Sequence, residues 1–248
     1  MTRAVAALAL ALPLAARAAT TVELSQGAEA LSGDRPAWRV SALDAVWTGE
    51  PGAAVGGSVR ELSRFGLEDV DGAIWAQAPL GGFVLGVEGS ASPTWRFVPR
   101  WSLGARLERG LGDGWVASLA SSARRYEGDV GRTTVTISSL GLERYWDRWR
   151  AAAYATAAGV EGAWGGSGRA VLDLYYGASG RVGVSVAAGR ELESLGGGQV
   201  LRTDVLAVAL AGAHPFGAGW AMTWEVSAQR QGDLYSRAGG RLGLRRRF

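Results

Sequence analysis

The chain has 248 residues, of which 48% are hydrophobic and 20% are charged, and its formal net charge is +3. This composition excludes a disordered chain of low hydrophobicity, and the 38 glycines follow no three-residue period, which excludes collagen. Cysteine is absent, histidine occurs once, at His214, and every basic residue is arginine. Disulfides, thiolate metal sites, lysine chemistry and sites built from several histidines are therefore excluded.

The first 18 residues have the pattern of a cleaved signal peptide. Arg3 supplies a positive start, Ala4 to Leu14 form an apolar run, and Ala16-Arg17-Ala18 fits a cleavage site between small residues. The run is shorter than the roughly 20 residues that a transmembrane helix needs. We therefore expect an exported mature domain over residues 19–248. Loss of Arg3 and Arg17 lowers its formal charge to +1, so no nucleic-acid partner is predicted.

Beyond the signal peptide, apolar residues alternate with polar residues or glycine, which predicts β-strands with one apolar face. The odd positions of Trp101–Glu108 are apolar, and so are the even positions of Trp220–Gln229. Within Thr133–Glu143 the apolar parity switches, and we expect a β-bulge near Ser138-Ser139. Turn residues divide the chain into about 14 strands, near 20–31, 36–47, 53–65, 67–78, 83–91, 96–109, 114–126, 132–145, 148–157, 166–177, 181–192, 200–214, 218–230 and 234–248. An even number suits a bacterial barrel. Twelve is the alternative if the first pair, or the weak pair around Gly66, lies outside the wall.

Two architectures suit so many alternating strands: a soluble β-protein and an outer-membrane barrel. Trp115, Trp149 and Trp220 each open a strand after alternate turns, which in a hairpin array predicts one common height, as in the aromatic girdle of a membrane–water interface. Gly243 and the terminal Phe248 fit the ending of outer-membrane barrels, whose final strand is read as an assembly signal. Arg246 departs from that pattern, because an aromatic residue is common there.

These features together predict the fold class and the location. We expect an all-β protein, an antiparallel up-and-down transmembrane β-barrel of about 14 strands, in the outer membrane of a Gram-negative bacterium. Its expected partners are the outer-membrane lipid and the barrel assembly machinery.

The polar faces of the strands predict which side chains line the lumen. The residues expected there are Arg100, Arg106, Glu108, Asp173, Glu225, Arg241, Arg245 and Arg247. Both signs of charge occur, so ion pairs that offset each other's desolvation are one interpretation. The other is a polar channel that binds or passes anionic solutes, favoured by the arginine excess in the last strand.

Six short segments punctuate the mature chain: Pro36-Ala37-Trp38, Arg64-Phe65-Gly66, Ala78-Pro79, Pro99-Arg100, Leu142-Glu143-Arg144-Tyr145-Trp146 and the ending Gly243-Leu244-Arg245-Arg246-Arg247-Phe248. In this order they resemble the YaiO-type outer-membrane β-barrel family. The resemblance covers nearly the whole mature chain. It implies an outer-membrane barrel with distant similarity to the barrels of exopolysaccharide exporters, and it implies no catalytic or binding residue.

Three functions are open on the sequence alone. The first is a non-enzymatic barrel that acts as a small pore or an export conduit, linked to an envelope polysaccharide or exopolysaccharide. The second is a structural or interaction barrel with a closed lumen, because many small Ala and Gly side chains let a wall flatten. The third, a lipid or glycan hydrolase, is disfavoured because His214 is the only imidazole and lies beside a turn expected on the periplasmic side. No catalytic residue, cofactor or metal ligand is predicted.

Overall fold

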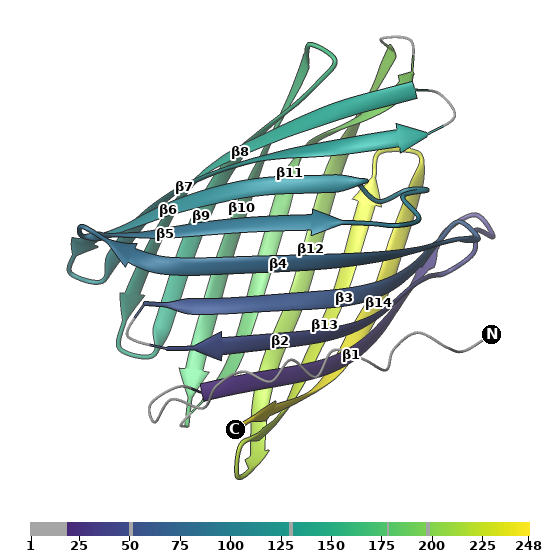
Figure 1. Ribbon diagram of the computed structural model, residues 1–248. Helices are drawn as coiled ribbons and strands as arrows, with labels where there is room; N and C mark the ends of the chain where they lie inside the picture. The colour runs from purple at the N-terminus through teal and green to yellow at the C-terminus, as the bar shows by residue number, and fades with distance from the viewer. Residues whose placement is uncertain (1–18, 50–51, 129–130, 178, 197–198) are drawn as a thin grey trace.

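In the computed structural model, described over residues 19–49, 52–128, 131–177, 179–196 and 199–248, the chain forms 14 β-strands (Figure 1). They are β1 Ala19–Leu31, β2 Trp38–Thr48, β3 Ala54–Arg64, β4 Leu67–Leu80, β5 Phe83–Ala91, β6 Trp101–Gly112, β7 Trp115–Gly128, β8 Gly131–Trp146, β9 Trp149–Val160, β10 Ala163–Tyr176, β11 Gly180–Gly196, β12 Gln199–Gly217, β13 Trp220–Gln231 and β14 Tyr235–Arg247. Within the described ranges, no helix is long and apolar enough to cross a membrane. The predicted barrel of 14 strands is confirmed, and the alternative of 12 strands is wrong. The expected signal peptide, residues 1–18, lies outside the described residues.

Every strand pairs antiparallel with its neighbours in the sequence, and β1 pairs with β14, so the sheet closes on itself. The closing seam between β1 and β14 runs from Thr21 opposite Arg247 to Leu31 opposite Arg237. In Figure 1 the strands β2–β5 cross in front of the steeper strands β9–β13. The start of β1 and the end of β14 lie together, where the Phe248 N–H donates to the Thr20 carbonyl at 2.8 Å. We call this the terminal end of the barrel, and the opposite end the far end.

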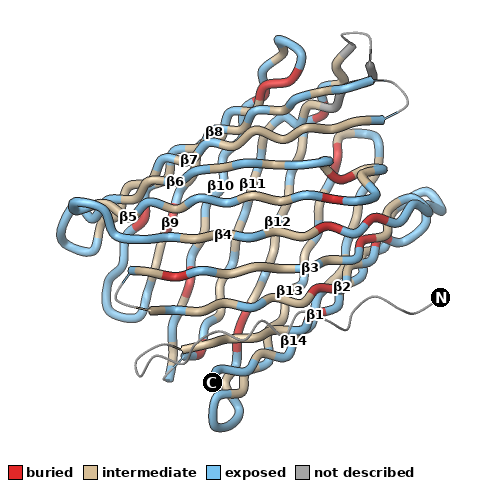
Figure 2. The backbone as a smooth tube through the Cα atoms, viewed as in Figure 1, coloured by how far each residue is buried: buried red, intermediate tan, exposed pale blue. Residues whose placement is uncertain are grey.

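The outer surface of the barrel is apolar and the lumen is polar, because successive side chains of a strand point to opposite faces. On β14, Arg245 reaches Glu23 across the lumen face, whereas Leu242 and Leu244 point outward and are 63% and 47% exposed. Among the described residues, buried side chains are as often polar as apolar, and they are scattered around the wall (Figure 2). This inversion of a soluble protein's pattern suits a wall that faces lipid.

Two details of the predicted strands are wrong. β8 has no bulge near Ser138-Ser139, because its register with both β7 and β9 is continuous there. The parity switch has another cause: towards the far end of β8 the lumen face carries Val135 and Ile137, and the outer face becomes polar. In addition, β6 begins at Trp101 and not near residue 96, so residues 92–100 form a connection.

Candidate functional site: the polar lumen

The most buried ion pairs among the described residues of the lumen lie on β8, β9 and β10. Arg150 donates from Nε to Glu143 at 2.8 Å and from Nη1 to Asp173 at 2.6 Å. Tyr154 and Tyr145 donate their hydroxyls to the same Glu143 carboxylate, at 2.7 and 3.0 Å. The side chains of Glu143 and Asp173 are each 5% exposed, and that of Arg150 is 16% exposed. One guanidinium group therefore pairs with two buried carboxylates at once, and removing it would leave buried negative charge without its nearest partner.

Two predicted lumen residues of β6 extend this cluster. Arg106 Nε lies 2.5 Å from Glu108 Oε1, and its Nη2 lies 3.5 Å from Glu143 Oε1. Their side chains are more open, at 46% and 33% exposed. We call the whole group the wall network, made of Arg106, Glu108, Glu143, Arg150, Tyr154 and Asp173. Asp173, Arg106 and Glu108, which sequence reasoning placed in the lumen separately, thus belong to one connected group.

A second set of polar bonds crosses the closing seam near the terminal end. Arg245 donates from Nε to Glu23 of β1 at 2.7 Å, and Thr223 of β13 donates to the other oxygen of the same carboxylate at 2.7 Å. A Cβ at Gly243 would collide with Thr223 Oγ1 and would come within 2.8 Å of Glu23 Oε1. A side chain at this position would therefore displace Thr223 and Glu23 from their hydrogen bond.

Arginines and aromatic rings meet at the far end of the lumen. The guanidinium carbons of Arg64 and Arg237 each lie 4.6 Å from the centre of the Trp38 ring. Arg64 also lies 5.5 Å from the ring of Phe97, in the β5–β6 connection. Arg237 is paired with Glu29 at 2.5 Å, whereas no carboxylate of the described residues forms an ion pair with Arg64. Two cations therefore contact one ring, and only one of them has an acidic partner among the described residues. We call this group the arginine–tryptophan stack (Trp38, Arg64, Arg237).

Further aromatic rings surround this stack. The Trp38 ring meets those of Phe65 and Tyr235 edge-on, with centroids 5.2 and 6.0 Å apart. Trp38 and Phe65 belong to two of the segments on which the YaiO-type resemblance rests, and the barrel brings them into contact across the ends of β2 and β3. The far end of the lumen is therefore lined by rings and guanidinium groups on the side of the closing seam.

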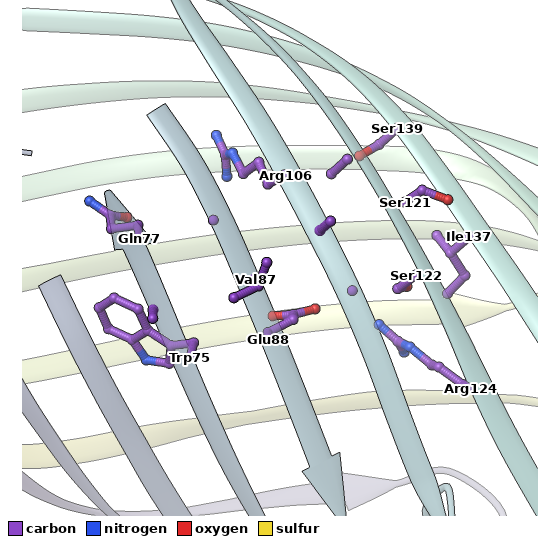
Figure 3. Close-up of a pocket in the computed structure, with 15 residues that line it drawn as sticks. Trp75, Gln77, Val87, Glu88, Arg106, Ser121, Ser122, Arg124, Ile137 and Ser139 are labelled. Carbon is purple, nitrogen blue, oxygen red and sulfur yellow. The ribbon is translucent and has the colours of Figure 1, made fainter. Parts of the chain in front are cut away.

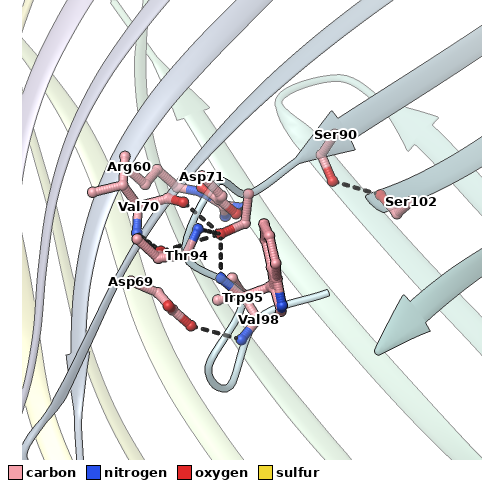
Figure 4. A network of polar contacts seen from close by, with 10 residues as sticks. Arg60, Asp69, Val70, Asp71, Ser90, Thr94, Trp95, Val98 and Ser102 are labelled. Carbon is pink, nitrogen blue, oxygen red and sulfur yellow. Dashed lines mark hydrogen bonds and ion pairs between the residues drawn. The ribbon is translucent and has the colours of Figure 1, made fainter. Parts of the chain in front are cut away.

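The β5–β6 connection, residues 92–100, completes the wall where β5 is too short. β5 pairs with β4 only from Gly72 onward, so residues 67–71 of β4 have no strand on that side. There the Ser92 hydroxyl donates to the Val70 carbonyl at 2.7 Å, and the Val70 N–H donates to Thr94 Oγ1 at 2.9 Å (Figure 4). Two side-chain hydroxyls thus take over the backbone bonds that a neighbouring strand would make.

Asp69 of β4 holds the same connection in place. Its side chain is almost fully buried, at 1% exposed for the residue. The carboxylate accepts the N–H groups of Arg96, Phe97 and Val98 at 2.9, 2.8 and 3.0 Å. Arg100, predicted on a strand of the lumen wall, instead ends this connection, and its Nη1 lies 2.6 Å from Glu127 Oε2. The reason is that residues 96–98 bend toward Asp69 and do not extend as a strand.

Two recesses open from the lumen into its wall. The first, of about 330 Å³, lies on β4–β8 and is lined among others by Trp75, Gln77, Glu88, Arg106, Ser122 and Arg124 (Figure 3). The second, of about 260 Å³, lies beside the closing seam toward the far end, on β1–β3, β13 and β14. Its lining includes Glu29, Trp38, Arg64, Glu225, Ser227 and Arg241, and we call it the seam recess.

Trp115, Trp149 and Trp220 occupy equivalent positions at the terminal end. They open β7, β9 and β13. In each case the carbonyl of the residue before the tryptophan accepts an N–H from the following strand: Gly114 from Tyr145 at 2.8 Å, Arg148 from Tyr175 at 2.8 Å, and Gly219 from Arg247 at 2.7 Å. Strand alternation points all three rings outward, because Trp149, for example, precedes the lumen-facing Arg150.

The last strand ends in a stack on the outer face. The guanidinium carbon of Arg246 lies 5.0 Å from the Trp220 ring and 4.8 Å from the Phe248 ring, and Phe248 is 65% exposed. The residue that departs from the usual ending pattern is thus a cation held between two rings. Arg247, its neighbour, points to the lumen side at the terminal end.

His214 lies on β12, on the outer face of the barrel near the terminal end. Its Nδ1 is 3.3 Å from the Tyr176 hydroxyl, and Met222 is its partner in register on β13. No group of three or more His, Cys, Asp or Glu side chains among the described residues has the geometry to hold a metal ion. The imidazole therefore has no contact with the polar lumen.

No protein-family model and no curated protein matches the chain. Solved structures do match over 90% or more of it. An anion-selective porin from Comamonas acidovorans superimposes with a TM-score of 0.54 at 11% identity, over 93% of this chain and 99% of the porin. OmpF of Salmonella typhi gives a TM-score of 0.52 at 9% identity over 93% and 97%, and the KdgM porin gives 0.50 at 11% over 90% and 98%. The fold is that of an outer-membrane β-barrel. At these identities the likeness concerns the fold alone.

Sequence reasoning missed the residues that organise this lumen. Arg150, the centre of the wall network, sits at the same strand parity as Tyr154, so the polar face of β9 was readable as Arg150-x-Ala152-x-Tyr154. The arginine–tryptophan stack offered no such local signal, because Trp38 and Arg237 are joined only by closure of the barrel.

Proposed function

We propose that the protein is a non-enzymatic pore of the outer membrane, through which small hydrophilic solutes cross the lumen. The observation that carries the proposal is the closed wall with apolar side chains outside and charged recesses inside. A water-filled lumen needs such polar groups, and a lipid-facing wall needs the apolar ones. The likeness in fold to three porins supports it.

Conductance across planar lipid bilayers tests the pore. The purified folded barrel is added to one chamber, and we expect discrete, ohmic current steps that heat-unfolded protein does not give. Folded protein that inserts into vesicles but carries no current would overturn the proposal, and would favour the structural barrel with a closed lumen.

The proposal also places the barrel in the membrane. The terminal end faces the periplasm, Trp115, Trp149 and Trp220 lie in the aromatic girdle of the inner leaflet, and residues 1–18 are removed on export. A mature N-terminus near Ala19, found by mass spectrometry of the membrane form, is the expected result. An intact N-terminus there would contradict it.

Phe248 is proposed as the group that the barrel assembly machinery reads, with Gly243 in the same strand. Deleting Phe248 is expected to lower the outer-membrane level several-fold, whereas Phe248→Tyr, which keeps an aromatic end, is expected to retain it. Equal levels of the deletion variant and the unchanged protein would show that assembly uses another signal.

The narrower part of the proposal is that transport is linked to export of an envelope polysaccharide or exopolysaccharide. It rests on the YaiO-type resemblance alone. Deleting the gene should lower the surface polysaccharide released into the medium, and restoring the unchanged gene should recover it. An unchanged polysaccharide yield would leave a general diffusion pore.

A further inference from the structure

Several arginines on the lumen face are matched with an acid of the described residues, whereas Arg64 and Arg241 of the seam recess are not. Arg60 donates to both oxygens of Asp71, at 2.8 and 2.5 Å, and Arg245 donates to Glu23 at 2.7 Å. In the seam recess, by contrast, neither Arg64 nor Arg241 has an ion pair with a carboxylate of the described residues. The recess therefore presents two guanidinium groups whose N–H donors have no acidic partner.

Aromatic rings hold Arg64 in place, and the strand register places Arg241 in the same recess. Arg64 is fixed by aromatic rings, at 4.6 Å from the centre of Trp38 and 5.5 Å from that of Phe97. A guanidinium held over a ring keeps its N–H donors in plane and available at its edge. Arg241 stands opposite Glu225 on β13 and opposite Gly27 on β1, yet no ion pair joins it to Glu225.

The polar groups of the recess are of two kinds. Arg64 and Arg241 offer guanidinium N–H donors that suit a carboxylate, and those of Arg64 are held over a ring. Glu225 and Ser227, on the same face of β13, offer acceptors and a hydroxyl that suit the hydroxyl groups of a ligand. A volume of about 260 Å³ is below the roughly 300–1,000 Å³ of pockets for drug-sized ligands, so the ligand is a small molecule.

We infer that the seam recess is a binding subsite for a small polyhydroxylated carboxylic acid, that is, a sugar acid of a single unit. The inference rests on the proposed pore for the path of the solute and adds the class of solute. One carboxylate is matched to two arginines, and the neighbouring Glu225 disfavours ions of higher negative charge while it accepts hydroxyl donors. Its position toward the far end brings it into contact with a solute that enters from that end.

Binding of D-gluconate and of D-sorbitol tests the inference, because the two have the same carbon chain and differ in the carboxylate. Isothermal titration calorimetry on the folded barrel in detergent is expected to show gluconate binding and no sorbitol binding. In the double variant Arg64→Gln and Arg241→Gln, gluconate affinity is expected to fall at least tenfold, about 1.4 kcal/mol. Arg247→Gln, which removes a lumen-side arginine outside the recess, should leave it unchanged.

Three results would overturn the subsite: equal binding of sorbitol, unchanged affinity in the double variant, or an equal loss in Arg247→Gln. Retained heat-modifiable mobility on gels shows that each variant is folded, and the single variants replace the double one if it is not. Conductance is measured on the same preparations. A barrel that conducts but binds no gluconate overturns the subsite alone, and one that binds gluconate without conducting overturns the pore alone.

Discussion

The wall network and the seam recess both contain arginines and acidic residues, but they differ in whether the arginines are paired with the acids. In the wall network, Arg150 contacts two carboxylates that are each 5% exposed. In the seam recess, Arg64 and Arg241 line an open volume of about 260 Å³, and neither is paired with an acid among the described residues. Oppositely charged side chains that face each other hold neighbouring strands together, whereas arginines without an acidic partner remain available to a solute.

The comparison also separates stability from function within one lumen. A buried charge destabilises the fold when its partner is removed. Substitutions in the wall network should therefore lower the stability of the barrel. Substitutions in the seam recess should change the stability of the barrel little and should act on ligand binding instead. Four substitutions test this division, from the largest expected effect to the smallest.

Arg150→Met should have the largest effect. It leaves the buried Asp173 without its arginine and Glu143 with only the more distant Arg106 and two tyrosine hydroxyls, and breaking a buried pair typically costs about 3–5 kcal/mol. We expect a clear fall in the urea concentration at which tryptophan fluorescence reports unfolding in micelles.

A second variant shows whether charge is the reason. Adding Glu143→Gln and Asp173→Asn to Arg150→Met removes the unpaired charges, and should recover most of the lost stability. If the triple variant is no more stable than Arg150→Met alone, loss of packing and not loss of charge balance explains the effect.

Asp69→Ala should have the next largest effect. Asp69 is a buried carboxylate that accepts three backbone N–H groups and has no arginine partner among the described residues. Its loss leaves those donors without an acceptor, which costs about 1–3 kcal/mol of stability for a buried group. Hydrogen exchange at Arg96, Phe97 and Val98 should speed up markedly. Glu68→Ala, the adjacent position on the outer face, is the control and should leave exchange unchanged.

Arg241→Gln should leave stability within about 0.5 kcal/mol of the unchanged protein, because no ion pair is lost. The same urea titration measures it beside Arg150→Met. A destabilisation as large as that of Arg150→Met would mean that Arg241 stabilises the barrel as a paired arginine does, and would contradict its description as unpaired.

His214→Ala should have the smallest effect on transport. The imidazole is on the outer face, 3.3 Å from the Tyr176 hydroxyl and away from both polar regions. Single-channel conductance is expected to be unchanged. A large loss of conductance in a correctly inserted His214→Ala barrel would mean that the outer face near the terminal end controls the lumen.

The strands were predictable because polarity alternates along most of them. The partners of the lumen side chains were not predictable, because they depend on how the sheet closes into a barrel. β12 shows where the pattern fails: Val205 to Ala213 has no polar side chain on either face, so polarity gives no register there. In the barrel, size alternates there instead, with Leu206, Val208 and Leu210 exposed on the outer face and small alanines toward the lumen.

The lumen residues illustrate the same limit. Asp173 and Arg245 were predictable from strand parity, but their partners Arg150 and Glu23 lie on other strands, and in the case of Glu23 at the opposite end of the chain. The strand predicted near 96–109, which includes Arg100, begins too early because Asp69 binds the backbone of residues 96–98 and bends the connection that precedes β6. Patterns along the chain identify faces, and only the closed sheet identifies neighbours.

The short β5 has a practical consequence for anyone who wants to redesign this barrel. Ser92 and Thr94 bond the open flank of β4 through their hydroxyls, so two adjacent strands of unequal length coexist without a gap in the wall. A peptide tag inserted between residues 92 and 98 would break those bonds and expose an unpaired strand edge that is prone to associate with other chains. In the β4–β5 turn, by contrast, no atom lies within 4 Å of the place where a side chain on Gly81 or Gly82 would begin, so this turn is the safer place to graft foreign sequence.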